Sequence, residues 1–169
     1  MPNFHQGELD GSPLSIAVVV SRFNESITER LVDSCVDELI RLGVEDEEID
    51  VFWVPGAFEI APVVSRLLDD SRYDAIITLG CVIRGETSHY DHIAQTTAHQ
   101  LSELAQNDAI PVIFGVLTTE NQAQALARSG GEKSDTGEYV AQTAVEMANL
   151  FAELPETDDE EEDEVEMVD

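Results

Sequence analysis

Residues 84–89, with the sequence RGETSH, carry the clearest chemical signal in the chain. Gly85 lets the backbone approach a ligand, and the free N–H groups at the start of a following helix form an anion site. His89 falls in the first turn of that predicted helix, where the helix dipole disfavours the positively charged ring. A neutral histidine beside an anion site is suited to proton transfer on a phosphorylated substrate. A lone histidine at a helix start is also commonly a surface residue, and this segment alone leaves both interpretations open.

Three further residues are candidates for ligand contact. Phe23 directly follows an apolar run, and it would either stack on a flat heterocycle or pack in the core. Glu59 stands inside the apolar string VPGAFEIAPVV, so it lies on an exposed helix face or accepts hydrogen bonds from a polyol or amine. Arg128 ends a short predicted helix, where it caps carbonyl groups or holds a phosphate.

The elements that would position these residues follow from the apolar pattern. Short runs rich in valine and isoleucine predict buried strands, and the segments between them have helical spacing. The strands are expected at residues 14–21, 50–54, 74–83 and 110–117, and the helices at residues 24–43, 57–68, 88–106, 120–128 and about 140–151. Ser26 and Glu29 form a capping-box pattern, and Gly43 is a natural helix stop. Pro62 requires the second helix to begin near Ala61 or to bend there.

Strands that alternate with helices imply parallel strands joined by right-handed crossovers. The fold class is therefore α/β, a three-layer α/β/α sandwich around a four-stranded parallel sheet with flavodoxin-like topology. We expect an N-terminal segment at residues 1–13, one domain at 14–154 and an acidic disordered tail at 155–169. Sites in such sheets lie at the carboxyl ends of the strands, which is where the candidate residues fall.

Charge limits the partners and suggests the environment. The chain has 36 acidic and 8 basic residues and a formal net charge of −28, which argues against nucleic acid or an anionic membrane as a partner. The expected cause is a surface adapted to high salt, as in a halophile. No apolar run is long enough to cross a membrane and the N-terminus does not resemble a signal peptide, so we expect a cytoplasmic protein. Cys35 and Cys81 have no metal spacing and are expected to be buried thiols in a reducing compartment.

Five segments together resemble the lumazine synthases, the penultimate enzymes of riboflavin synthesis. They are VVVSRFNESIT, VPGAFEIAPVV, YDAIITLGCVIRGETSHYDHIA, IPVIFGVLTTEN and VEMAN, and the similarity runs without gaps from about Gly7 to Phe151. The resemblance implies condensation of 5-amino-6-(D-ribitylamino)uracil with 3,4-dihydroxy-2-butanone 4-phosphate to give 6,7-dimethyl-8-ribityllumazine. It implies no cofactor and no metal. It also implies a homopentamer or an icosahedral shell of twelve pentamers, and together with the charge it suggests a halophilic archaeon as the source.

The resemblance also assigns roles to individual residues. Phe23 would stack on the pyrimidine ring, and His89 would transfer protons. The residues implied to hold the ribityl chain are Asn24, Ala57 and Glu59, and those implied to offer backbone contacts to the ring are Val82 and Ile83. The residues implied to line the phosphate pocket are Gly85, Glu86 and Thr87.

Two more residues would come from a neighbouring subunit, because this family has its active sites at subunit interfaces. Phe114 would close the pocket, and Arg128 would bind the phosphate of the sugar. One departure from the family's pattern concerns the loop after Arg128. Thr136 occupies a place where a phosphate-binding lysine is often found, and Lys133 is the only lysine of the chain.

Three alternatives belong to other functional classes. A flavin-binding module would need a glycine-rich phosphate loop after the first strand, and SRFNES has no glycine. A phospho-acceptor signalling domain needs an aspartate at the end of the third strand, where this chain has Cys81 and Val82. A structural shell protein derived from an enzyme would have no need to keep Phe23, Glu59, His89 and Arg128 together.

Overall fold

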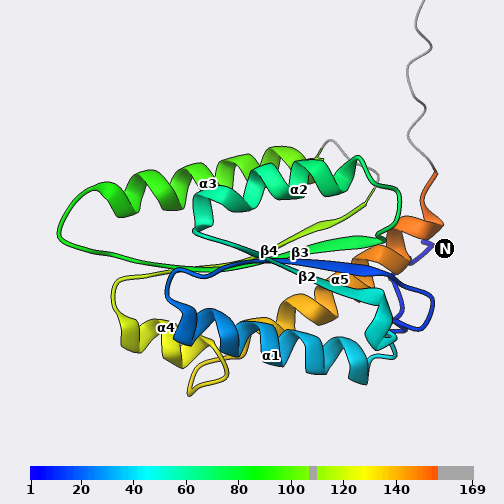
Figure 1. Cartoon of the computed structure of the whole chain (residues 1–169). Coiled ribbons are helices and arrows are strands. Elements are labelled where there is room, and N and C mark those ends of the chain that lie inside the picture. The colour runs from blue at the N-terminus through cyan, green and yellow to red at the C-terminus, as the bar shows by residue number, and fades with distance from the viewer. Residues whose placement is uncertain (107–109, 156–169) are drawn as a thin grey trace, which may run out of the picture.

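The computed structural model describes residues 1–106 and 110–155, and within them four parallel strands form a sheet between two layers of helices (Figure 1). The strands are β1 (Ile16–Ser21), β2 (Ile49–Val54), β3 (Ala75–Ile83) and β4 (Val112–Thr119). The α-helices are α1 (Glu25–Arg41), α2 (Ile60–Leu68), α3 (His89–Gln106), α4 (Gln122–Arg128) and α5 (Thr136–Glu153). Two short 3-10 turns, η1 (Asp46–Glu48) and η2 (Ala57–Glu59), precede β2 and α2. The predicted α/β fold class is confirmed.

The sheet has the strand order β2-β1-β3-β4, so β1 and β3 are its central strands. All six residues of β1 are buried, which explains why its sequence is a continuous apolar run and not an alternating one. Val18 and Val20 pack among residues of α1 and α5, whereas Ala17 and Val19 pack among residues of α2 and α3. Figure 1 shows the same two layers, with α2 and α3 on one face and α1, α4 and α5 on the other.

The start of α1 differs from the sequence prediction. Asn24 occupies the cap position in the left-handed conformation (φ 61°), and Ser26 therefore lies inside the first turn. The side chain of Asn24 does not cap the helix; its Nδ2 donates a hydrogen bond to the carbonyl oxygen of Cys81 at 2.8 Å. The capping-box prediction was wrong, because a bond to β3 fixes the chain at this point.

Most other boundaries lie within two residues of those expected. Gly43 has φ 101° just after α1, as a helix stop should. Pro62 lies in the first turn of α2, where its missing N–H costs no hydrogen bond. β4 extends two residues further than predicted, because Thr118 and Thr119 pair with Val82 and Ile83 at the end of β3.

The segment before β1 packs against the last helix, and the N-terminus lies beside the end of α5 (Figure 1). The side-chain amide of Asn149 donates to the carbonyl oxygens of Glu8 and Asp10, at 2.7 and 2.9 Å. Gly7 is buried so closely that a Cβ there would overlap the carbonyl oxygen of Glu146. Residues 156–169 of the predicted acidic tail lie outside the described residues. In the part of the chain that is described, no helix has the length and apolar character needed to span a bilayer.

Candidate active site

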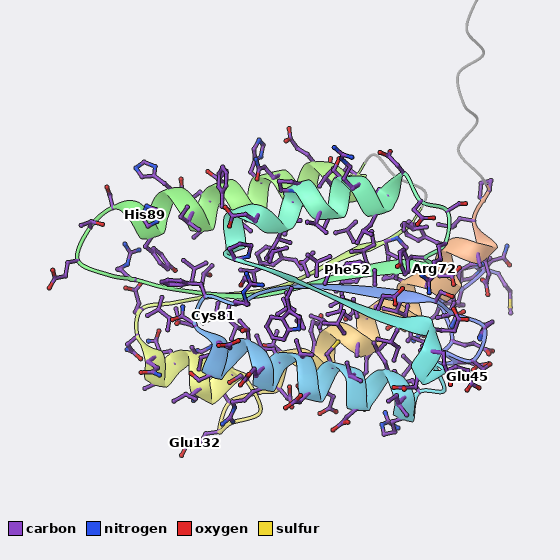
Figure 2. The ribbon with its side chains drawn as sticks, viewed as in Figure 1. Glu45, Phe52, Arg72, Cys81, His89 and Glu132 are labelled. Atoms are coloured by element: carbon purple, nitrogen blue, oxygen red, sulfur yellow. The ribbon has the colours of Figure 1, made fainter. Side chains whose placement is uncertain are left out.

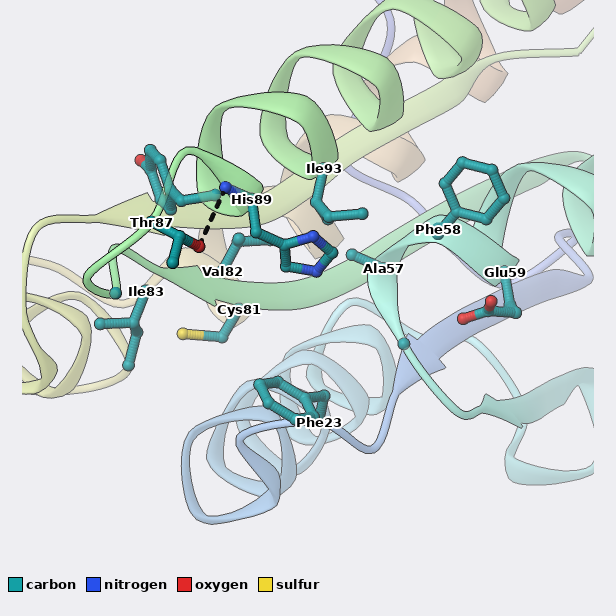
Figure 3. Close-up of a pocket in the computed structure, with 13 residues that line it drawn as sticks. Phe23, Ala57, Phe58, Glu59, Cys81, Val82, Ile83, Thr87, His89 and Ile93 are labelled. Carbon is teal, nitrogen blue, oxygen red and sulfur yellow. Dashed lines mark hydrogen bonds between the residues drawn. The ribbon is translucent and has the colours of Figure 1, made fainter.

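A pocket of about 640 Å³ opens where β1, β2 and β3 end, as expected for a parallel sheet (Figure 3). Its lining residues come from the loops after these three strands and from the first turns of α3. They are Phe23, Gly56, Ala57, Phe58, Glu59, Cys81, Val82, Ile83, Gly85, Thr87, His89, Tyr90 and Ile93.

The loop after β1 places an aromatic ring at the pocket mouth. The backbone N–H of Arg22 donates to the carbonyl of Val54 at 2.8 Å, and that of Phe23 donates to Pro55 at 3.1 Å, so the chain continues alongside β2 beyond the sheet. Phe23 is 71% exposed, which shows that it is not a core residue of this chain. Exposed phenyl faces are costly in water, and a flat heterocycle stacked on the ring would cover it.

The turn after β2 supplies a second wall. Ala57 is buried, whereas Phe58 and Glu59 are exposed, because η2 turns successive side chains to different sides. The carboxylate of Glu59 lies near the rim, and a Cβ on Gly56 would stand 3.0 Å from its Oε2. Of the two possibilities left open by the sequence, Glu59 is therefore an exposed carboxylate, and it is one of the residues that line the pocket (Figure 3).

The segment after β3 supplies the third wall and the histidine. Val82 and Ile83 are half-buried at the end of the strand, and the exposed loop that follows leads into α3. His89 is the first residue of α3, as predicted, and its backbone N–H donates to the hydroxyl of Thr87 at 3.3 Å. Its ring reaches towards Ala57 across the pocket from Phe23 (Figure 3). No atom lies within 4 Å of the position that a Cβ on Gly85 would occupy, so the loop has open space beside it.

Cys81 forms part of the pocket floor, and its thiol is not a nucleophile at neutral pH. The residue is 2% exposed, and burial raises the pKa of its thiol to about 11. Since the thiolate is the reactive form, this side chain acts as a small apolar surface.

Eight of the predicted site residues line this pocket, and four do not. The eight are Phe23, Ala57, Glu59, Val82, Ile83, Gly85, Thr87 and His89. Asn24 uses its amide to hold β1 against β3, and Glu86 is exposed on the loop without lining the pocket. Phe114 lies in the middle of β4, and Arg128 lies at the end of α4, where its guanidinium donates to the carbonyl of Gln124 at 3.0 Å.

Five lining residues were not predicted from the sequence: Gly56, Phe58, Cys81, Tyr90 and Ile93. Ile93 lies four residues after His89 on α3 and therefore on the same helix face, so the helical period could have identified it. Phe58 and Tyr90 directly adjoin predicted residues, but the direction of their side chains depends on the tight turns that carry them.

A comparison with protein-family models identifies the family of the chain. The model described as 6,7-dimethyl-8-ribityllumazine synthase matches residues 13–152, which include every wall of the pocket. The chain belongs to this family. It is therefore a transferase of riboflavin biosynthesis, and it condenses 5-amino-6-(D-ribitylamino)uracil with 3,4-dihydroxy-2-butanone 4-phosphate. The lumazine synthase family acts on these two small molecules and forms oligomers, so the expectation of an enzyme with two small-molecule substrates is confirmed.

Proposed function

We propose that the pocket at the ends of β1, β2 and β3 is one half of the lumazine synthase active site, and that a second copy of the chain supplies the other half. The observation that carries this proposal is that the predicted site residues fall into two groups in the structure. Eight of them meet in one pocket, while Phe114 and Arg128 lie on β4 and α4, away from its walls. Phe114 is 46% exposed on an edge strand, which is consistent with a side chain that reaches a neighbouring subunit.

Each wall of the pocket has a role in this proposal. Phe23 stacks on the pyrimidine ring, and the backbone of Val82 and Ile83 meets the edge of the ring. The open space beside Gly85, next to the first N–H groups of α3, accepts the phosphate together with Glu86 and Thr87. The substrate's ribityl hydroxyls meet Ala57 and Glu59 in the turn after β2, with Asn24, at the start of α1, beside them.

The reaction needs positioning more than it needs a reactive protein group. The amine of the pyrimidine attacks the ketone of the sugar phosphate, water leaves, and an imine joins the two substrates. Proton shifts, loss of phosphate and ring closure then give the lumazine. Holding both substrates in register supplies several kcal/mol of barrier reduction, on the order of 7 or more in well-oriented systems. His89 lies at the edge of the phosphate loop, where it is placed to move protons.

The wider setting is also part of the proposal. We propose a homopentamer, which can close into an icosahedral shell of twelve pentamers, in the cytoplasm of a halophilic archaeon. The domain spans residues 14–154, after an N-terminal segment at 1–13 and before an acidic tail at 155–169. The net charge of −28 supports the halophilic source. We propose no metal and no cofactor, since the additions, eliminations and proton shifts of the condensation demand neither a metal, nor a nucleotide, nor a nucleophile of the enzyme.

Lumazine absorbance tests the site directly. Both substrates are mixed with the protein in high salt, and the rate is compared with those of His89→Ala and Arg128→Ala. We expect His89→Ala to lower kcat by about 10²-fold, because proton transfer is lost while positioning remains. Arg128→Ala should raise KM for the sugar phosphate by about 10- to 100-fold, because a charge-assisted bond is lost. Rates equal to that of the unaltered protein in both variants would refute the proposed site.

A further inference from the structure

The guanidinium group of Arg84 makes three hydrogen bonds to carboxylates within the chain. Its Nη1 and Nη2 donate to both carboxylate oxygens of Asp91, at 3.2 and 3.0 Å, and its Nε donates to Glu120 at 2.8 Å. The guanidinium also lies over the ring of Tyr90, 4.3 Å from its centre. A planar fork that binds two carboxylates and stacks on a ring has a single defined orientation.

Arg84 does not line the pocket, although its neighbours do. Gly85, Thr87 and Tyr90 all contribute to the wall, whereas the side chain of Arg84 binds carboxylates outside the lining of the pocket. Three of its five N–H groups are already engaged by carboxylates. The side chain is therefore arranged to hold protein segments and not to bind the substrate's phosphate.

The partners of Arg84 come from the two segments that border the phosphate loop. Asp91 lies in the first turn of α3, two residues after His89, and Glu120 lies between β4 and α4. The backbone N–H of Arg84 donates to Thr119 at 2.9 Å, so the residue itself is fixed to the end of β4. One end of the loop at 85–88 is thus anchored at Arg84, and the other end is tied back to the same side chain through Asp91.

We infer that Arg84 is a positioning residue for the sugar phosphate. By clamping Asp91 and Glu120, it fixes the distance between the start of the loop and the first turn of α3. The loop's N–H groups are then held where the phosphate binds. This inference rests on the proposed placement of the phosphate beside Gly85, and it adds Arg84 to the residues on which that phosphate site depends.

Steady-state kinetics of Arg84→Gln, with each substrate varied in turn, test this inference. We expect KM for the sugar phosphate to rise about tenfold, because a loop displaced by a fraction of an ångström loses aligned contacts to the phosphate. KM for the pyrimidine should stay within about twofold of its original value, because Val82 and Ile83, whose backbone meets the ring, are held by pairing with β4 and not by the side chain of Arg84. Arg84→Lys should resemble Arg84→Gln, because lysine has the charge but not the fork.

Arg72 offers a matched control at the opposite end of the molecule from His89 (Figure 2). It makes the same kinds of contact, an ion pair with Asp50 at 3.0 Å and a position over the ring of Tyr73, 5.3 Å from its centre. The loss of an ion pair and a ring contact could change the kinetics only by making the protein less stable. In that case Arg72→Gln and Arg84→Gln would have the same effect on the melting temperature and on the kinetics. We expect Arg72→Gln to leave KM for both substrates unchanged.

A second variant keeps the test decisive if Arg84→Gln folds poorly. Asp91→Asn retains the size of the side chain and the charge of Arg84, but it weakens the clamp. The inference requires KM for the sugar phosphate to rise in this variant as well. A fall in KM would show that Asp91 acts only by repelling the phosphate, and it would overturn the positioning role.

The outcomes also separate this inference from the proposed site. If Arg128→Gln raises KM for the sugar phosphate and Arg84→Gln does not, the site stands and the role of Arg84 is rejected. If neither variant changes KM, the placement of the phosphate itself is wrong. An equal rise in KM for both substrates in Arg84→Gln would also reject the inference, because it would indicate general distortion of the pocket.

Discussion

The thiol of Cys35 is enclosed between α1 and α5, and the residue has no exposed surface. Burial is the main cause that raises the pKa of this thiol to about 12, and the negative charge of Asp135 adds to it. In the folded protein the thiol of Cys35 therefore stays protonated up to a much higher pH than it does in the unfolded chain. The consequence is a dependence of stability on alkaline pH.

Because the pKa of this thiol is raised in the folded protein, the stability of the protein decreases as the pH becomes alkaline. Between pH 9 and 12 the folded protein keeps a proton that the unfolded chain releases, so stability decreases as pH rises. At pH 10.5 the loss from this group is about 2 kcal/mol. We expect Cys35→Ala to lower stability at pH 8 but to lose less of it between pH 8 and pH 10.5. Urea unfolding at the two pH values measures this, and equal losses in both proteins would contradict it.

Sequence reasoning at the level of single residues selected side chains that the structure brings together. An aromatic after a strand, a carboxylate in an apolar string and a histidine at a helix start were all identified, and Phe23, Glu59 and His89 meet in one pocket. The prediction of the helix cap of α1 was wrong, because Ser26 and Glu29 match a local capping pattern while Asn24 occupies the cap position. A hydrogen bond to a carbonyl 57 residues away decided the conformation, and local patterns contain no such information.

Among the elements, α1 and α5 pack closely against each other at a glycine. A Cβ on Gly137, in the first turn of α5, would overlap the hydroxyl of Ser34 and the carbonyl oxygen of Leu31. The hydroxyl of Ser34 donates to Asp135 at 2.7 Å, and Asp135 in turn caps α5 by accepting from the N–H of Glu138 at 3.2 Å. The start of α5 is therefore fixed against α1 by contact and by hydrogen bonds.

Gly137→Ala should destabilise the protein by about 1–3 kcal/mol, because the two helices must separate to admit a methyl group. The melting temperature should fall by roughly 2–4 °C for each kcal/mol. Gly85→Ala is the matched control for stability, since nothing lies within 4 Å of its added methyl group. If both variants melt at the same temperature as the unaltered protein, the approach of α5 to α1 is looser than described.

Elements were predicted well because their apolar periods are strong and their ends are marked. Pro62 limits where α2 can begin and Gly43 limits where α1 can end, and both helices have the predicted ends at these residues. The end of β4 was placed too early, since Thr118 and Thr119 are polar and their place in the sheet comes from pairing with β3. Strand pairing is a property of two segments, and a single window of sequence does not specify it.

For the whole molecule, the proposed sharing of the active site between subunits makes a clear prediction about mixed assemblies. His89→Ala and Arg128→Ala each damage a different half of the same site. If equal amounts are unfolded and refolded together, about a quarter of the interfaces should combine an intact His89 from one subunit with an intact Arg128 from the next. At sugar phosphate concentrations well below the KM of the unaltered protein, the lumazine-forming rate should then rise to about a quarter of the original, well above that of either variant alone.

Mixing the two variants after each has assembled is the control, because subunits that do not exchange cannot share sites. A refolded mixture that is no faster than the average of the two variants would place both residues in the same subunit's site, and the interface proposal would fail.

The charge of the whole molecule predicts how it responds to salt. With 36 acidic and 8 basic residues, repulsion opposes folding at low ionic strength. Raising KCl from 0.1 to 3 M shortens the screening length from about 10 Å to under about 3 Å, so the melting temperature should rise throughout this range. Sucrose at equal osmolality stabilises without screening and is the comparison. An equal rise in sucrose would show that charge repulsion is not the cause.

The bonds from Asn149 to Glu8 and Asp10 have a consequence for synthesis of the chain. The carbonyl oxygens of Glu8 and Asp10 bind a residue of α5 that is made 141 and 139 residues later. Until α5 emerges, the apolar surface that it covers on α1 and β3 stays open to water or to a chaperone. The domain therefore completes its folding only after α5 has been translated, and a nascent chain that stops before Val140 leaves this apolar surface uncovered.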